Sequence, residues 1–336
     1  MPTPHDTFTT SADFYARLEA WATNRTDGSL RRCLAAVVGN YAFLRRHLKP
    51  RHVSSVPTLV VGSLMVGGAG KTPIVRYLAM RCRDFGRCAV VCRGWKGQIK
   101  QATVVEPTMG AQDVGDEAVW FRKALPRDVS VIASPDLAAG QRLAERMADV
   151  IVVDDGFQSW SLPRTADIVV VKPSLASGVI PNGCLREGTS ALKSADLLWS
   201  HENESEAESA ARPETHFCVR SRYRLSYLTT TLGKDLPRDW LEGRRVTVAS
   251  GLGRNESFLK TVLDAGAQIE HVIKCGDHRP ISKEMFKGIT GLPIVITEKD
   301  AVKWRHDFPA VVAGVTIEIL EGSKRLDAQL DRWCRL

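Results

Sequence analysis

The chain has 336 residues, of which 44% are hydrophobic and 25% are charged. These values are typical of a globular protein and exclude a disordered or collagen-like chain, and the length predicts about two domains. The 46 basic and 38 acidic residues give a formal net charge of +8. Six of the cations and no acid lie between Leu30 and His52, so most of the excess charge is local. A local basic patch favours an anionic surface as partner and argues against nucleic acid.

Residues 1–55 combine this basic patch with an amphipathic pattern. The first 20 residues are polar and carry acids, which is unlike a secretory signal. The longest apolar run near the start, Cys33 to Leu44, has 12 residues and is too short to span a bilayer. Arginines lie on both sides of this run, so we predict a helix at the membrane surface with its cations near anionic headgroups. A helix packed on the protein's own first domain is the alternative.

Short apolar runs alternate with amphipathic stretches from Pro57 onward. The runs are Thr58–Val61, Cys88–Val91, Val129–Ala133, Val150–Val153 and Ile168–Val171. The stretches between them include Pro73–Arg83 and Leu137–Met147. Continuous apolar strands separated by helices predict a parallel sheet that is covered on both faces, so the first domain is α/β.

The composition changes at His201. Residues 201–215 are rich in glutamate with nothing apolar larger than alanine, so we predict an exposed loop, followed by an extended connector over Phe217–Thr229. A second alternation then predicts a second α/β domain with a cleft between the two. Its elements are Val246–Ala249, Ile269–Ile273, Pro293–Thr297 and Val311–Leu320 as strands, and Glu256–Asp264, Lys283–Ile289 and Ser323–Arg335 as helices.

A glycine-rich segment follows the first predicted strand. Residues 60–73 read VVGSLMVGGAGKTP, which predicts a strand, a tight turn and a helix that opens at Thr72. Backbone N–H groups of such a turn can surround phosphate oxygens, with Lys71 reaching the β- and γ-phosphates and the Thr72 hydroxyl ligating Mg²⁺. The strict pattern has glycine where this chain has Met65, and a glycine-rich turn without a ligand is the alternative. The residues predicted to bind the nucleotide are Gly67, Gly68, Ala69, Gly70, Lys71 and Thr72.

Acidic residues end another predicted strand, in the sequence VIVVDDG over residues 150–156. A carboxylate at the carboxyl end of a buried strand suits the metal side of a nucleotide site, although Asp-Gly is also a common turn. Together with the glycine-rich loop, Asp154 and Asp155 predict binding of ATP and Mg²⁺. The eight cysteines include no C-x-x-C pair, so we expect no zinc site or disulfide framework, and buried reduced thiols in a cytosolic protein.

The order of motifs resembles the tetraacyldisaccharide 4′-kinase family of the lipid A pathway. The motifs are VGSLMVGGAGKTP, CRGWKG (92–97), VGDE (114–117), VDDGFQ (153–158), LRE (185–187), SGLGRNESF (250–258), GDH (276–278) and TEKDAVK (297–303). The chain departs from the family pattern at Ala118, Ser159, Gly188 and Arg279. The resemblance implies transfer of the ATP γ-phosphoryl group to the 4′-hydroxyl of a tetraacylated disaccharide 1-phosphate at the cytoplasmic face of the bacterial inner membrane. No protein partner is implied.

The resemblance also implies two α/β/α sandwich domains, the first a P-loop domain, joined by a two-stranded linker. The expected divisions are a membrane-surface segment over 1–55, a P-loop kinase domain over 56–215, a linker strand over 216–232, a second α/β domain over 233–310, and a return strand and helix over 311–336. Asp116 and His278 are the implied catalytic pair, brought together when the domains close. A first-turn helix acid and a loop histidine are the local alternatives. Glu187 joins Thr72, Asp154 and Asp155 as an expected metal-side residue.

The residues leave two other classes of protein open. One is a different P-loop ATPase or small-molecule kinase, although the signature lysine of partitioning ATPases is replaced by Val66 and the guanine-reading Asn-Lys-x-Asp is absent. The other is a nucleotide-dependent binding protein, which would need Lys71 and Thr72 but neither Asp116 nor His278. The role of Thr297–Asp300 stays open, because Thr-x-x-Asp also forms a helix cap.

Overall fold

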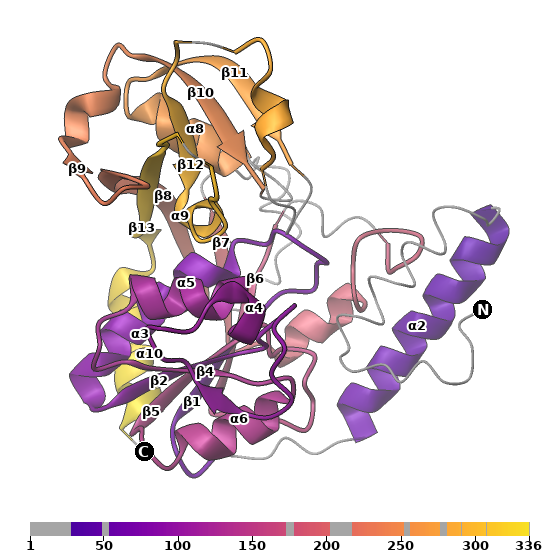
Figure 1. Ribbon diagram of the computed structural model, residues 1–336. Coiled ribbons are helices and arrows are strands. Elements are labelled where there is room, and N and C mark those ends of the chain that lie inside the picture. The colour runs from indigo at the N-terminus through magenta and orange to yellow at the C-terminus, as the bar shows by residue number, and fades with distance from the viewer. Residues whose placement is uncertain are drawn as a thin grey trace.

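The fold is described from a computed structural model of the chain. It describes residues 28–48, 54–172, 178–201, 217–251, 256–275, 281–289, 291–306 and 308–335. Within these ranges the chain forms one 13-stranded sheet with helices packed on it, in the strand order β11-β10-β12-β13-β8-β7-β6-β1-β5-β2-β4-β3 with β9 paired to β8. Figure 1 shows two lobes along this sheet.

The first lobe contains the five predicted parallel strands and a further one, β7, which was not predicted. They are β1 (Thr58–Gly62), β2 (Cys88–Cys92), β4 (Ser130–Ala133), β5 (Val150–Asp154), β6 (Ala166–Val170) and β7 (Leu197–His201), with the antiparallel β3 (Thr103–Val104) at the edge. β1 lies between β5 and β6, and its five residues are buried, as those of β5 are. This placement brings the carboxyl ends of β1 and β5 together at one edge of the sheet, where the phosphate loop and Asp154 follow.

Helices cover both faces of this part of the sheet, as predicted. On one face, α3 (Lys71–Cys82), α5 (Asp116–Ala124) and α10 (Ser323–Cys334) share a hydrophobic core with the strands. On the other face, α6 (Leu137–Ala144) packs into a second core. The short segments α4 (Ala111–Val114), η1 (Arg83–Phe85) and η3 (Thr189–Ser194) complete the lobe. The sheet thus buries continuous apolar strands on both sides.

The second lobe extends the same sheet. It contains β9 (Asp235–Leu236), η4 (Arg238–Leu241), β10 (Arg245–Ser250), α8 (Glu256–Asp264), β11 (Gln268–Lys274), η5 (Lys283–Phe286), β12 (Ile294–Thr297) and α9 (Glu298–Ala301). The helix predicted over Lys283–Ile289 is wrong in length, because only a 3₁₀ turn forms before Gly288 adopts a φ of 83°. Gly288 ends the turn in the left-handed conformation that glycine adopts at low cost.

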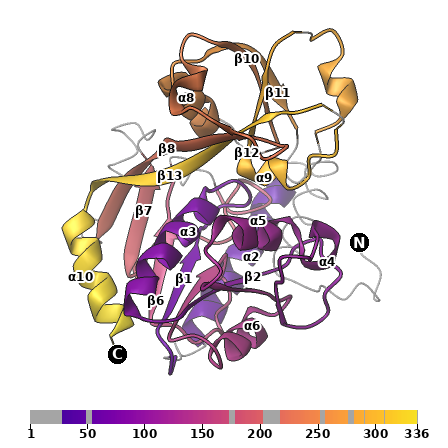
Figure 2. The ribbon, with the colours of Figure 1, turned by 60° about the vertical axis from the view of Figure 1, so that its left-hand side comes forward.

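Two long antiparallel strands join the lobes. β8 (Cys218–Thr230) and β13 (Val311–Glu321) pair along almost their whole length, and β13 leads into α10 on the first lobe (Figure 2). The connector predicted over Phe217–Thr229 is therefore a sheet strand. At its start β8 pairs in parallel with β7, so the sheet is continuous from one lobe to the other.

The helix α2 (Gly28–Leu48) lies beside the first lobe (Figure 1). Its Val38 and Ala42 side chains are buried, while Val37, Tyr41 and Leu44 are among the exposed large hydrophobic residues. The helix thus has one apolar face against the protein and one apolar face in solvent. Among the described residues, no helix has the length and hydrophobicity required to cross a membrane.

Two expectations need correction. His201 was predicted to start the exposed loop, but it ends β7 and is buried, because the sheet strand continues through it. Residues 202–216 lie outside the described residues. The eight cysteines are all free, as predicted, but not all are buried, since Cys33 is exposed and Cys184 and Cys218 are partly exposed.

Candidate active site

The phosphate loop connects β1 to α3 in the predicted strand–turn–helix arrangement. Gly67 and Gly70 have positive φ angles of 72° and 78°, and Gly70 occupies the position just before α3 begins at Lys71. Gly67 and Gly68 are exposed, so the turn is open to a ligand at these two residues. A helix amino terminus that follows such a turn favours an anion.

Met65 occupies the position where the strict phosphate-loop pattern has glycine. Its side chain is 2% exposed and packs in a small core under the loop with Leu185 and Phe157. Its backbone forms a β-bridge with Leu185. Apolar packing therefore fixes the loop at this point, and the side chain at residue 65 is buried in the core while Gly67 and Gly68 are exposed.

Lys71 and Asp155 meet at the end of the loop. The Lys71 Nζ lies 3.0 Å from Asp155 Oδ1, and Arg186 donates to both oxygens of the same carboxylate, at 3.0 and 3.1 Å. Burial alone would raise the pKa of Asp155, but the charges of Arg186 and Lys71 outweigh it and hold that pKa well below its usual range. Asp155 also has a positive φ of 53°, which is uncommon outside glycine and turns its carboxylate toward the loop lysine.

Asp154 differs from its neighbour. Burial, reinforced by the charge of Glu117, raises the pKa of the Asp154 carboxyl to about 8. Its Oδ1 atom is buried and has no hydrogen-bond partner among the described residues. An orphaned carboxylate oxygen beside a phosphate loop fits a hard cation, because Mg²⁺ prefers oxygen ligands.

A site for Mg²⁺ made only of protein groups is not present in the described part of the chain, where no cluster of three or more His, Cys, Asp or Glu side chains has suitable geometry. Mg²⁺ in phosphoryl-transfer sites is commonly bound by one or two carboxylates together with substrate phosphates and water. Thr72, Asp154 and Asp155 match that donor set. The residues at this site therefore fit the metal.

Glu187 has other partners. Both of its oxygens accept hydrogen bonds from Arg46 of α2, at 2.6 and 3.1 Å, and Oε1 also accepts from Gln158 at 3.0 Å. The Glu187 side chain is 2% exposed. The expectation that Glu187 lies on the metal side left direct ligation open, and a cation would have to displace Arg46 and Gln158 to bind Glu187 directly.

Asp116 is buried at the amino end of α5, and its carboxylate pairs with Lys303 Nζ at 2.5 Å. The next residue, Glu117, pairs with Lys299 at 2.8 Å. Both lysines belong to the second lobe, so the TEKDAVK segment contacts the predicted catalytic aspartate and its neighbour from the other lobe. The second predicted catalytic residue, His278, lies outside the described residues.

The role left open for Thr297–Asp300 is partly structural. Thr297 Oγ1 accepts from the Asp300 N–H at 3.1 Å and donates to Asp300 Oδ2 at 2.7 Å, so it caps α9. Between them, Glu298 accepts from Arg76 of α3 at 3.0 Å and from Tyr227 of β8 at 2.7 Å. The capped helix therefore carries some of the contacts between the second lobe and the rest of the protein.

Two contacts on the loop carbonyls could not be predicted from the sequence. Lys172 Nζ donates to the Gly68 carbonyl at 2.9 Å, and the Tyr223 hydroxyl of β8 donates to the Gly70 carbonyl at 3.1 Å. His201 Nε2 lies 2.9 Å from the same hydroxyl. No local pattern marks these residues, since Tyr223 is 153 positions from Gly70. The apolar residues just before His201 indicate a strand that could include this histidine, but they do not indicate its contact with Tyr223.

Comparison with known proteins identifies the family. The model of the tetraacyldisaccharide-1-P 4′-kinase family, LpxK, matches residues 30–335. The chain belongs to this family. A tetraacyldisaccharide 4′-kinase of Anaeromyxobacter dehalogenans is 33% identical over 332 residues, covering 89% of this chain and 87% of the relative. One from Halothermothrix orenii is 31% identical over 297 residues and covers 77% of each chain.

A solved structure of the same family agrees with this fold. The crystal structure of LpxK from Aquifex aeolicus in complex with ATP has a TM-score of 0.72 at 26% identity, covering 91% of this chain and 97% of that one. These findings confirm the predicted family, the predicted α/β fold with a large, mostly parallel sheet, and the predicted class of enzyme.

In this LpxK family member, His201 gives a testable pH dependence. Burial lowers the pKa of His201 from 6.5 to about 3. Between these values only the unfolded chain takes up the proton, so the stability contributed by neutral His201 is complete above pH 6.5 and is lost as the pH falls toward 3. We expect the free energy of unfolding of the wild type to fall by up to about 1.4 kcal/mol per pH unit more steeply than that of His201→Gln. Denaturant titrations at pH 7.5, 6 and 5 measure the two slopes, and equal slopes would contradict the assignment.

Proposed function

We propose that this chain transfers the γ-phosphoryl group of ATP to the 4′-hydroxyl of a tetraacylated glucosamine disaccharide 1-phosphate, a step in lipid A biosynthesis. The observation that carries the proposal is the loop from Gly67 to Thr72, open at its glycines and ending beside the Lys71–Asp155 pair, in a chain of the LpxK family. The ATP-bound relative, which covers 91% of this chain, supports ATP as the donor.

The loop supplies the nucleotide site in this proposal. The N–H groups of Gly67, Gly68, Ala69, Gly70 and Lys71 bind the phosphates, and the Lys71 ammonium moves from Asp155 to the β- and γ-phosphate oxygens. Thr72, Asp154 and Asp155 hold Mg²⁺, which when bound neutralises charge on the transferring phosphoryl group. Arg186 keeps Asp155 ionised and in place when Lys71 turns to the nucleotide. Glu187 acts on this site through Gln158 rather than as a ligand.

Asp116 and His278 are the proposed catalytic pair. Asp116 accepts the proton of the 4′-hydroxyl, a role that suits a buried carboxylate where the two lobes meet. The Lys303 ammonium now occupies one of its oxygens, so the substrate hydroxyl competes with Lys303 for this carboxylate. We propose that His278 joins Asp116 in this step, and that the pair forms only when the lobes close. Closure would exclude water and so suppress ATP hydrolysis.

We infer a division of the chain that follows from these roles. Residues 56–215 form the kinase domain and 233–310 the second α/β domain. Residues 216–232 and 311–336 contain the strands that join them, and the last segment also contains α10. The segment 1–55 serves the membrane surface. The pairing of β8 with β13 along almost their whole length supports their assignment as the strands that join the two domains.

We propose that the chain is attached to the cytoplasmic face of the inner membrane, and the solvent-facing row of α2 supports attachment to a membrane surface. Val37, Tyr41 and Leu44 are 65%, 54% and 53% exposed and lie on one side of the helix at spacings of four and three. A row of exposed apolar side chains with nearby arginines is typical of an interfacial helix. The acylated substrate of the proposed reaction would remain in the same bilayer.

Polar substitution of this row tests the attachment. We expect Val37→Asn/Leu44→Asn to lower the partition of the full chain into anionic phospholipid vesicles by about tenfold, because about two buried side chains are lost from the interface. Vesicle sedimentation measures the bound fraction. The control is Leu232→Asn, which changes a similarly exposed leucine (81%) on the second lobe. Equal binding of the double variant and the wild type would contradict an interfacial α2.

The phosphoryl-transfer reaction itself is tested with ATP labelled at the γ-phosphate. The full chain is incubated with Mg²⁺ and a tetraacylated disaccharide 1-phosphate in detergent micelles, and the lipid is separated by thin-layer chromatography. We expect the label to appear in a bisphosphorylated lipid. Release of free phosphate at the same rate with and without the lipid would favour a different P-loop ATPase. Nucleotide binding without either reaction would favour a binding protein.

A further inference from the structure

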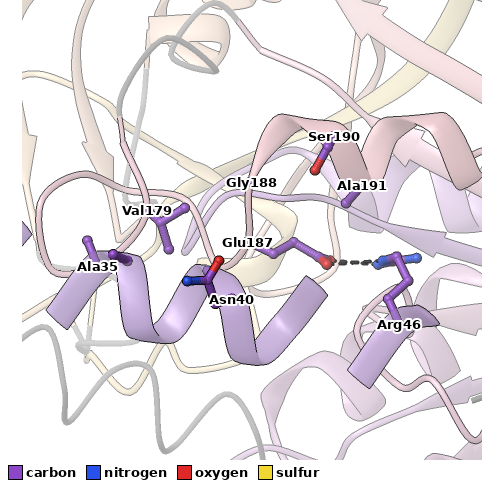
Figure 3. Close-up of a pocket in the computed structure, with 10 residues that line it drawn as sticks. Ala35, Asn40, Arg46, Val179, Glu187, Gly188, Ser190 and Ala191 are labelled. Carbon is purple, nitrogen blue, oxygen red and sulfur yellow. Dashed lines mark hydrogen bonds and ion pairs between the residues drawn. The ribbon is translucent and has the colours of Figure 1, made fainter. Parts of the chain in front are cut away.

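We propose that Arg46 of α2 is a positioning residue for the phosphate loop, so that nucleotide binding depends on how α2 is seated on the first lobe. The inference rests on the proposed function of the loop as the ATP site. Figure 3 shows Arg46 reaching from α2 to Glu187 across the space between the helix and residues 179–191. A pocket of about 280 Å³ lies between these two segments.

Arg46 contacts three side chains of the first lobe. Its guanidinium donates to both oxygens of Glu187 and, at 2.8 Å, to the Ser194 hydroxyl. The guanidinium carbon also lies 4.1 Å from the centroid of the Phe157 ring. The Arg46 side chain is 11% exposed and Glu187 is 2% exposed, so solvent screens this pair far less than it screens a surface ion pair. Arg46 therefore fixes two side chains at once, Glu187 and Phe157.

The Glu187 segment supports the first half of the loop. The Arg186 N–H donates to the Leu64 carbonyl at 2.7 Å, and the Val66 N–H donates to the Cys184 carbonyl at 2.9 Å. Met65, between them, forms its β-bridge with Leu185. Residues 184–187 thus lie along residues 64–66 like a short strand. A shift of Glu187 would therefore also shift residues 64–66, which lead directly into the exposed Gly67 and Gly68.

A second path leads through Gln158. Its Nε2 donates to Glu187 Oε1 at 3.0 Å and to the Ser63 carbonyl at 3.1 Å, and its Oε1 accepts from Arg186 at 3.2 Å. Arg186 in turn holds Asp155, the partner of Lys71. Hydrogen bonds therefore connect Arg46 to the carboxylate that positions the loop lysine.

Phe157 gives a third path to the loop. A Cβ atom at Gly62 would lie 2.3 Å from Phe157 Cβ, so Phe157 packs directly on the last residue of β1. The Arg46 guanidinium covers the ring of this same phenylalanine. The three paths start at one side chain of α2 and end at Ser63, Leu64 and Gly62, where the loop leaves the sheet. Arg46 therefore fixes the positions of the residues that lead into the phosphate loop, although it lies outside the nucleotide site.

Nucleotide affinity of the full chain in detergent tests the inference without the lipid substrate. Binding of the ATP analogue AMP-PNP is measured by titration calorimetry for the wild type, Arg46→Gln, Glu187→Gln and the double variant. We expect each single variant to weaken binding by about tenfold, because the loop amides lose their alignment. The double variant should be no weaker than the weaker single variant, since both changes break the same contact. Losses that multiply in the double variant would overturn the inference.

Three controls separate positioning from other roles. Arg32→Gln removes the same charge from an exposed site of α2, and we expect wild-type affinity for it. Measurements in EDTA remove the metal, so an effect of Glu187→Gln that vanishes there would assign Glu187 to Mg²⁺ and overturn its role as the partner of Arg46. The double variant carries no unpaired buried charge, so it keeps the test valid if a single variant fails to fold. Wild-type affinity of a folded double variant would mean that the pair serves stability alone, and would refute the proposal.

The same measurements distinguish this inference from the proposed reaction. If the lipid is not phosphorylated but Arg46→Gln still weakens AMP-PNP binding, the proposed acceptor is wrong and the role of Arg46 stands. If the lipid is phosphorylated and Arg46→Gln changes only vesicle binding, Arg46 is a membrane cation and the inference fails.

Discussion

Replacing Lys71 with methionine is expected to lower kcat/KM for phosphoryl transfer by about 1,000-fold, because the variant lacks the cation that stabilises charge on the transferring group. Asp155 would retain its contact with Arg186, so the fold should persist. Steady-state kinetics with labelled ATP measure the loss, and thermal unfolding checks the fold.

Lys260→Met is the matched control for this prediction. Lys260 lies on α8 and pairs with Asp264 at 2.9 Å on the exposed surface, and it makes no contact with Lys71 or Asp155. We expect its activity to remain within about twofold of the wild type, as is usual for an exposed ion pair. A Lys71→Met enzyme as active as this control would remove Lys71 from the reaction.

Asp116→Asn is expected to lower kcat by about 1,000-fold while AMP-PNP affinity stays within about twofold. Asparagine keeps the size of the side chain and its contact at the start of α5 but cannot accept the proton of the sugar hydroxyl. The separation of kcat from nucleotide affinity distinguishes a base from a residue that holds the loop. Single-turnover assays and calorimetry measure the two quantities.

Asp128→Asn gives the control for the removal of a carboxylate. Asp128 pairs with Arg83 near the surface of the same lobe, and its side chain is 58% exposed. We expect unchanged kcat for this variant. If Asp116→Asn retained full turnover, the carboxylate would be a helix-capping acid paired with Lys303, and the base would have to be sought elsewhere.

Local patterns were sufficient to predict the phosphate loop and its acidic companion. The run Val150–Asp154 reads as a buried strand, and parallel pairing of β1 with β5 brings its end beside the loop. The residue that weakened the motif, Met65, is explained only by packing, because its side chain enters a core under the loop that no local pattern reveals. The same limit applies to His201, whose strand extends one residue into a segment of charged composition.

Long-range pairs were not predictable from the sequence. Arg46 and Glu187 are 141 positions apart, and the sequence presents the first as one of six cations and the second as one acid of a motif. The contact of Lys303 with Asp116 joins the two lobes in the same way. Periodicity reports which face of an element is buried, but not which polar side chains meet when two buried faces pack. The motif placed Glu187 on the metal side without indicating that its oxygens accept hydrogen bonds from Arg46.

The most direct test of the central claim is a crystal structure of the full chain with AMP-PNP and Mg²⁺. We predict phosphate oxygens within hydrogen-bond distance of the N–H groups of residues 67–71, with the Lys71 ammonium on the β- and γ-phosphates and the metal beside Thr72, Asp154 and Asp155. A nucleotide bound elsewhere, with the loop empty and Lys71 still paired to Asp155, would contradict the assignment of this loop as the ATP site.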